Sequence, residues 1–211
     1  MKQVDKVLVL APHTDDGEIG CGGTLNRFIK EGKEVYYVAF SIARKSSKAR
    51  GYPEDILAKE VKNATKELGI EKDNLIIKDY PVRNFPKYRQ EILDDMIKVK
   101  QKLKPDLIFM PTQEDIHQDH SVIVEEGIRA FKRKIILGYE EPWNQITNKN
   151  NFFIKLNNED IEKKILSLKQ YESQFGRGYI DENYIWSLAK TRGVQINHEY
   201  AECFELIRYI Y

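Results

Sequence analysis

Short apolar runs alternate with longer amphipathic segments along the first two thirds of the chain. Runs rich in valine, isoleucine and leucine predict buried strands at 6–11, 35–40, 75–77, 106–110 and 135–137. Between them, apolar residues recur every three or four positions and predict helices at 25–32, 53–68, 88–103 and 121–131. Because parallel strands need crossover connections, this alternation predicts a mostly parallel sheet with helices on both faces.

The alternation weakens from residue 139. An asparagine-rich turn at 144–151 precedes a predicted strand at 152–156 and a predicted helix at 160–171. No repeat, low-complexity tract or linker separates this part from the rest, and 211 residues suit one core. We therefore expect a single domain over 1–211, an α/β, Rossmann-like three-layer sandwich whose last third decorates the sheet.

The composition argues against several classes of partner. Hydrophobic residues make up 41% of the chain, and 34 basic residues against 33 acidic ones leave a net charge of +1. This balance argues against nucleic acid or an anionic membrane as a partner, and no apolar stretch reaches the roughly 18 residues of a membrane span. Cys21 and Cys203 are too few for a disulfide scaffold, which favours a cytoplasmic protein. Assembly into a homo-oligomer stays open.

Three of the four histidines lie in two short acidic loops. One loop is His13-Thr14-Asp15-Asp16, after the first predicted strand, and the other is His117-Gln118-Asp119-His120, after the fourth. Ligands of open α/β sheets bind beyond the carboxyl ends of the strands, where the strand order reverses. If the order is 3-2-1-4, the first and fourth strands are neighbours at that reversal, and the two loops face one another.

Facing loops of this composition offer two imidazoles and a carboxylate. Such a set suits Zn²⁺ with an open fourth position, and it also forms the facial triad of non-haem Fe(II) enzymes. A further carboxylate and a further histidine remain beside it, as proton transfer in hydrolysis requires. The alternative interpretation is that these residues are helix N-caps and solvated loop charges, since helix starts favour anions.

The two loops also carry a family resemblance. The segment at 12–24, PHTDDGEIGCGGT, resembles the PHPDDxExGxGGT signature of the PIG-L/LmbE-like zinc deacetylases, and DIHQDH at 115–120 resembles that family's DxHPDH motif. Ser173-Gln174 and the AECF segment at 201–204 resemble its weaker SQ and AExF signatures, so the resemblance spans nearly the whole chain. Thr14 and Gln118 replace prolines, which removes a fixed φ angle from each loop.

The resemblance implies an LmbE-like fold and a role for each loop residue. By it, His13, Asp16 and His120 bind Zn²⁺, Asp15 is the general base and His117 the general acid. Asp119 is expected to orient or charge-stabilise His117 or, alternatively, to cap a helix. The implied reaction is hydrolysis of the N-acetyl group of an aminosugar, whether free, nucleotide-linked or part of a glycoconjugate, with release of acetate.

Residues after the second and third predicted strands should lie on the same rim as the metal loops. Arg44, Arg83 and Asn84 are therefore candidate substrate contacts. Trp143, Tyr184 and Trp186 are candidates for stacking on a sugar ring, although aromatics in such an irregular part more often pack. A catalytically silent sugar-binding module with the same fold is the alternative from another class. The sequence leaves open which sugar is used.

Overall fold

Residues 4–210 are described here from a computed structural model, and their strands form one seven-stranded sheet in the order β3-β2-β1-β4-β5-β7-β6. The strands are β1 (Lys6–Ala11), β2 (Glu34–Ala39), β3 (Leu75–Ile77), β4 (Leu107–Pro111), β5 (Ile135–Tyr139), β6 (Phe152–Leu156) and β7 (Tyr200–Arg208). Neighbours from β3 to β5 pair in parallel, whereas β7 is antiparallel to both β5 and β6. The expected order 3-2-1-4 and the α/β class are thus confirmed.

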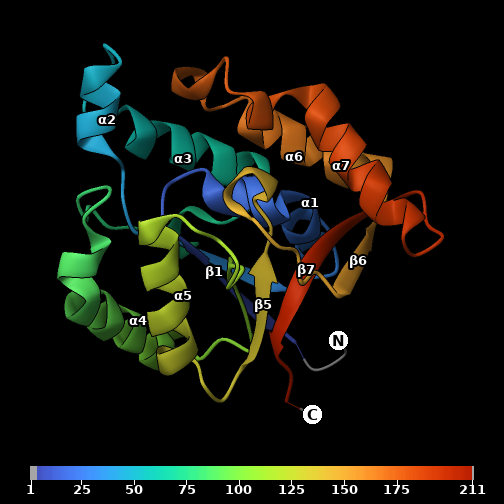
Figure 1. The fold of residues 1–211 in the computed structure, drawn as a ribbon, viewed down its shortest axis with the longest axis horizontal. Helices are drawn as coiled ribbons and strands as arrows, with labels where there is room; N and C mark the ends of the chain where they lie inside the picture. The colour runs from blue at the N-terminus through green and yellow to red at the C-terminus, as the bar shows by residue number, and fades with distance from the viewer. Residues whose placement is uncertain (1–3, 211) are drawn as a thin grey trace.

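Helices cover both faces of the sheet, as Figure 1 shows. They are α1 (Asp16–Lys30), α2 (Arg44–Ala49), α3 (Ile56–Glu67), α4 (Arg89–Leu103), α5 (Gln118–Ala130), α6 (Asn158–Leu168) and α7 (Glu182–Val194). The pair α4 and α5 lies on one face, and α1, α3 and α6 lie on the other. No helix within residues 4–210 has both the length and the apolar character that a membrane crossing needs.

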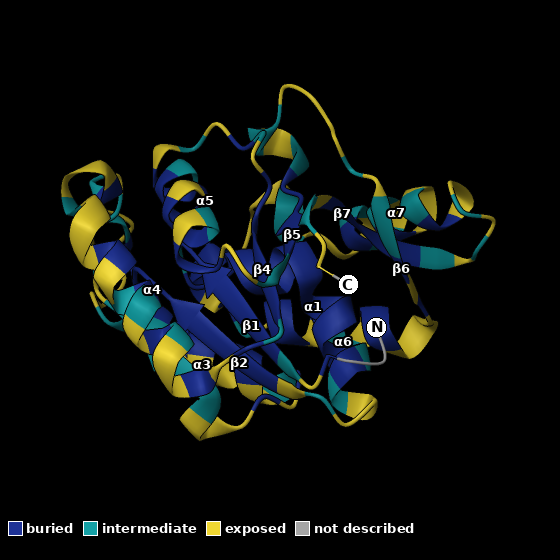
Figure 2. Ribbon diagram, turned by 90° about the horizontal axis from the view of Figure 1, so that it is seen from below, coloured by how far each residue is buried: buried dark blue, intermediate teal, exposed yellow. Residues whose placement is uncertain are grey.

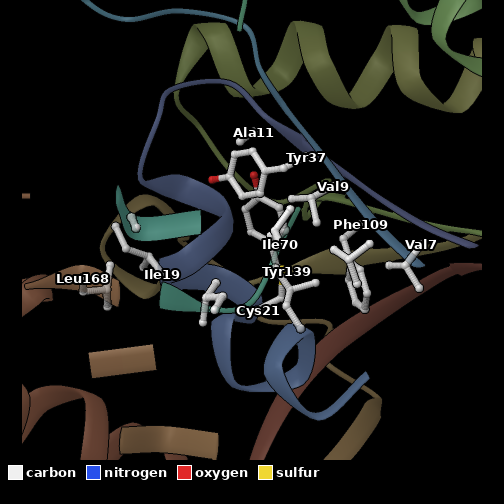
Figure 3. Close-up of a cluster of buried hydrophobic side chains, with 14 of the residues drawn as sticks. Val7, Val9, Ala11, Ile19, Cys21, Tyr37, Ile70, Phe109, Tyr139 and Leu168 are labelled. Atoms are coloured by element: carbon white, nitrogen blue, oxygen red, sulfur yellow. The ribbon is translucent and has the colours of Figure 1, made fainter. Parts of the chain in front are cut away.

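The central strand β1 is apolar on both faces because both faces are covered. Its residues Val7, Val9 and Ala11 pack into the cluster that includes α1, α3 and α6, while Leu8 and Leu10 pack into the cluster of α4 and α5. Figure 3 shows the first of these clusters, and Figure 2 shows the buried sheet between helices with exposed outer surfaces.

Helix α1 begins earlier than the glycine pattern predicts. The sequence indicates a helix that starts after Gly23, but α1 starts at Asp16 and contains the glycines, with a kink at Cys21 (φ −145°). A β-carbon on Gly20 would lie 2.3 Å from the Tyr139 ring, and one on Gly23 would lie 2.7 Å from Leu156. The glycines therefore permit close packing of α1 on β5 and β6.

Strand β7 and helix α7 are absent from the sequence-based prediction. The reason for β7 is that Glu202 and Glu205 are buried within it, so no apolar alternation is visible. Glu202 accepts hydrogen bonds from the backbone of Gly23 and Thr24 at the kink of α1, and Glu205 accepts one from the Thr112 hydroxyl. The last third thus extends the sheet through strands held by buried carboxylates, rather than merely decorating it.

Candidate active site

The two histidine loops meet at the carboxyl ends of the central strands β1 and β4. Strands β1 and β4 are parallel neighbours, so the loops that follow them leave the sheet side by side. His13 Nδ1 lies 3.3 Å from His120 Nε2, although the two residues are 107 positions apart. An Asp16 oxygen lies 3.3 Å from His13 Nδ1 and 3.4 Å from His120 Nε2. The fold therefore brings together the three residues expected to bind metal.

This triangle has the dimensions of a cation site. Ligand atoms of a tetrahedral ion lie about 3.3 Å apart when the bonds are roughly 2.0–2.1 Å long. Burial alone would lower the pKa of His13, but Asp16 and Asp119 outweigh it and raise that pKa to about 10. His120 and His13 in turn hold the pKa of Asp16 well below its usual range, against the effect of burial. The cluster without metal thus holds a proton on His13, which a metal ion would displace on binding.

Two further carboxylates contact the imidazoles of His13 and His120 at the ring nitrogens that point away from the triangle. Asp119 Oδ2 lies 3.1 Å from His13 Nε2, and Asp115 Oδ2 lies 2.7 Å from His120 Nδ1. Each contact leaves the other ring nitrogen facing the cluster, an arrangement common around metal-binding histidines. Sequence analysis assigned no role to Asp115, because a contact five residues away in the chain depends on how α5 begins.

Asp119 has a partner that was not expected. Its carboxylate contacts His13 directly and acts on His117 through its charge, and it also accepts hydrogen bonds from the backbone N–H groups of Arg83 (2.6 Å) and Phe85 (3.2 Å). The N-cap of α5 is His117, whose Nδ1 accepts from the Asp119 backbone N–H at 3.2 Å. Asp119 therefore joins the loop before α4 to the histidine cluster.

Asp15 and His117 line a cavity of about 310 Å³ beside the triangle. Burial and the neighbouring Asp16 raise the pKa of Asp15 to about 6, within reach of a general base. Burial, His120 and His13 lower the pKa of His117 to about 4, so this imidazole is neutral near pH 7. Since its Nδ1 is an acceptor, neutral His117 carries its proton on Nε2.

Only one of the three rim residues predicted to contact substrate lines this cavity. Arg83 does so. Arg44 is instead exposed and pairs with Asp79 at 2.5 Å, and the Asn84 amide donates to the Val82 carbonyl at 3.3 Å. Trp143 lines the cavity and stacks on Tyr179, with ring centroids 4.5 Å apart and planes 17° apart.

Glu141, which no sequence pattern indicated, is buried beside His120. Its Oε2 lies 3.9 Å from His120 Nδ1 and accepts a hydrogen bond from the Asn144 amide at 3.0 Å. Two overlapping sets of residues have ligand atoms within 4.8 Å of one another: His13, His117 and His120, and Asp16, His120 and Glu141. The signal that could have found Glu141 is its place just after β5, beside the end of β4.

The buried carboxyl group of Glu18 belongs to a hydrogen-bond network that holds the loop containing Thr14. Glu18 lies between the hydroxyls of Tyr37 and Tyr171, and both hydroxyls also approach the Thr14 carbonyl, at 2.9 Å and 2.6 Å. Two hydroxyl protons serve three acceptor oxygens, so the network is complete only if Glu18 keeps its own proton. Burial accordingly raises the pKa of Glu18 to about 8.

This pKa makes stability depend on pH. The folded protein retains a proton on Glu18 that the unfolded chain releases at an ordinary pKa of 4.5. The free energy of unfolding should therefore fall as pH rises from 4.5 to 8, by on the order of a few kcal/mol from this group. In the variant Glu18→Gln the amide can donate to Tyr37 and accept from Tyr171 without titrating. Urea unfolding of the chelator-treated proteins at several pH values should show a weaker decline for the variant, and equal declines would contradict this account of the network.

Comparisons with known proteins identify the family of the chain. Residues 8–131 match the PIG-L family, described as GlcNAc-PI de-N-acetylase. A diacetylchitobiose deacetylase of Thermococcus kodakarensis is 26% identical over 222 residues, which cover 94% of this chain and 82% of that protein.

Solved structures show the same fold. N,N'-diacetylchitobiose deacetylase from Pyrococcus horikoshii aligns with a TM-score of 0.81 and 24% identity over 97% of this chain and 84% of the other. GalB, the 4-carboxy-2-hydroxymuconate hydratase from Pseudomonas putida, aligns with a TM-score of 0.75 and 16% identity over 98% of each chain. Since a hydratase shares the architecture, the fold alone does not determine the reaction. The family match covers more than half of the chain and includes both histidine loops, and the chain therefore belongs to the PIG-L (GlcNAc-PI de-N-acetylase) family.

Proposed function

We propose that this protein is a zinc-dependent hydrolase that removes the N-acetyl group from an aminosugar or glycoconjugate and releases acetate. The observation that carries the proposal is the triangle of His13, Asp16 and His120 with edges of 3.3–3.4 Å, flanked by Asp15 and His117 on the cavity wall. The diacetylchitobiose deacetylases among its relatives support an N-acetylated sugar as the substrate.

Zinc is the metal that we propose for the triangle. Two imidazoles and one carboxylate suit a borderline ion that keeps an open position for substrate. When bound, such an ion supplies Lewis-acid chemistry that favours attack of water on an amide carbonyl. The same ligands could hold Fe(II), but oxygen chemistry does not need a base such as Asp15 beside the site.

Asp15 and His117 have separate parts in the proposed reaction. Asp15 takes the proton of the attacking water, and its raised pKa makes this transfer easier near neutral pH. His117 donates a hydrogen bond from Nε2 to the carbonyl oxygen, where negative charge develops. The departing amine takes a proton either from Asp15, which has just received the proton of the water, or from His117, the general acid that the family resemblance implies.

Release of acetate tests the proposal. Protein stripped of metal and then reconstituted anaerobically with Zn²⁺ or Fe²⁺ is mixed with N-acetylated sugars and sugar nucleotides, and products are followed by mass spectrometry. We expect the loss of one acetyl group with zinc. Tight binding of sugars without loss of acetyl would favour a silent binding module, and dioxygen-dependent turnover restricted to iron would favour an oxygenase.

The position of Asp119 predicts an effect on metal affinity. The variant Asp119→Asn should bind zinc about 10- to 100-fold more weakly, because it no longer supports the imidazole of His13 as a carboxylate does. Zinc affinity measured by competition with a chelator checks this. If Asp119 acted on His117 alone, zinc affinity would be unchanged and only turnover would fall.

A further inference from the structure

Arginines without acidic partners gather in the cavity beside the triangle. Among the arginines of residues 4–210, several form ion pairs with carboxylates: Arg27, Arg44, Arg89, Arg129 and Arg192. Within the same described part of the chain, five arginines form no such pair, Arg50, Arg83, Arg133, Arg177 and Arg208, and three of these, Arg50, Arg83 and Arg177, line this cavity. Three carboxyl groups line the same cavity, those of Asp15, Asp16 and Glu141, but none of them forms an ion pair with these arginines, so the guanidinium groups stay available to an anionic ligand.

The side chain of Arg50 is held by the neutral side chains of Gln174 and Tyr52. Arg50 Nη1 donates to Gln174 Oε1 at 3.0 Å, and its guanidinium carbon lies 6.0 Å from the centre of the Tyr52 ring. The Gln174 amide donates to the Ser173 hydroxyl at 2.8 Å, and that hydroxyl donates to Glu60 at 2.6 Å. Ser173, Gln174 and Glu60 are all buried, so Arg50 is anchored from the core while its charge stays uncompensated.

The other two arginines are placed by their backbone or by an aromatic ring. Arg83 has a left-handed backbone (φ +63°), and its N–H donates to Asp119, which also contacts His13. A non-glycine residue in this conformation is uncommon and points to a position that the surroundings impose. Arg177 lies over Tyr179, 5.6 Å from the ring centre, and its charge reaches Asp15.

We propose that these three arginines form an anion subsite, so that the preferred substrate is an N-acetylated aminosugar that also carries a phosphate or carboxylate group. Guanidinium groups bind both anions with paired hydrogen bonds, and they do so most strongly where no protein carboxylate competes. Arg50 and Gln174 join α2 to the segment after α6, which lies near the same end of the molecule in Figure 1. The pair of residues Ser173 and Gln174, which sequence analysis noted without a role, thus positions Arg50. The inference rests on the proposed function for the identity of the reacting amide.

Binding to chelator-treated protein tests the subsite without turnover. Calorimetry in a buffer free of phosphate compares GlcNAc 1-phosphate, GlcNAc 6-phosphate and N-acetylmuramic acid with the neutral sugars GlcNAc and N,N'-diacetylchitobiose. We expect at least one anionic sugar to bind about tenfold or more tightly than the neutral sugars. Which one binds best identifies the anion as a phosphate or a carboxylate.

Substitutions show whether the arginines cause the preference. R50Q and R177Q should each reduce the preference about tenfold, whereas R133Q, which removes an exposed arginine outside the cavity, should leave it unchanged. Equal binding of neutral and anionic sugars, or a preference that survives in the triple variant R50Q/R83Q/R177Q, would overturn the proposal.

Acetate release from the same sugars by the zinc-loaded protein separates this inference from the proposed function. Faster release from an anionic sugar supports both. Equal release from neutral and anionic sugars would overturn the anion subsite and leave the deacetylase function standing. Preferential binding of anionic sugars with no acetate from any of them would overturn the deacetylase function and leave the subsite standing.

Discussion

Replacing Asp15 with asparagine is expected to reduce kcat by about 10²- to 10⁴-fold, the usual contribution of a positioned base. Asparagine keeps the size of the side chain but cannot accept the proton of the attacking water. Because Asp15 is outside the triangle of His13, Asp16 and His120, the variant should still bind one equivalent of zinc. Acetate release and metal content, measured on the same preparation, check both parts.

The pH dependence of the unmodified enzyme belongs to the same prediction. The pKa of Asp15 is about 6 without metal and a bound cation lowers it, so activity should fall once pH drops to 6 or below and the base becomes protonated. Asp73→Asn is a matched control, because Asp73 is exposed in the turn before β3, at the opposite edge of the sheet. Near-normal turnover of Asp15→Asn with zinc bound would assign the base to another residue.

Loss of a residue of the triangle is expected to have an equally large effect. His120→Asn should weaken zinc binding more than about 100-fold, beyond the effect of removing a supporting carboxylate, and should reduce turnover about 10³-fold or more. Asparagine is preferred to alanine because its amide can still donate to Asp115, which is buried beside it.

The control for this substitution is His198→Ala. His198 lies away from the triangle, with Nδ1 3.1 Å from the Tyr200 carbonyl, and its loss should leave zinc affinity unchanged. Thermal unfolding of both variants shows whether either is merely unfolded. A folded His120→Asn protein with unimpaired zinc affinity would remove His120 from the metal site.

The sequence predicted the sheet order and the meeting of the two loops because both follow from regular physical patterns. Strands such as β1, buried on both faces, are continuous apolar runs, and parallel neighbours end at the same edge. The strand β7 escaped prediction because Glu202 and Glu205 interrupt its apolar pattern, and their partners lie in α1 and after β4. Buried carboxylates with distant partners are invisible to local periodicity.

The supporting residues of the site were harder to predict than the triangle itself. Asp115 and Glu141 act through contacts that exist only once α5 and β5 are in place. Among the arginines that follow the second strand, the sequence favoured Arg44 over Arg50 as a substrate contact. In the structure Arg44 forms an ion pair with Asp79, whereas Arg50 is held by Gln174, which is distant in sequence. Which loop charge faces a cavity depends on packing that no local pattern records.

The central claim is that two loops about a hundred residues apart bind one zinc ion. Crystals of the zinc-loaded protein, measured at the zinc absorption edge, test it most directly. We expect one anomalous peak roughly 2.0–2.2 Å from His13 Nδ1, from His120 Nε2 and from an Asp16 oxygen, with Asp15 and His117 unbound. A zinc ion held by His13, His117 and His120 without Asp16, or one placed outside this edge of the sheet, would contradict it.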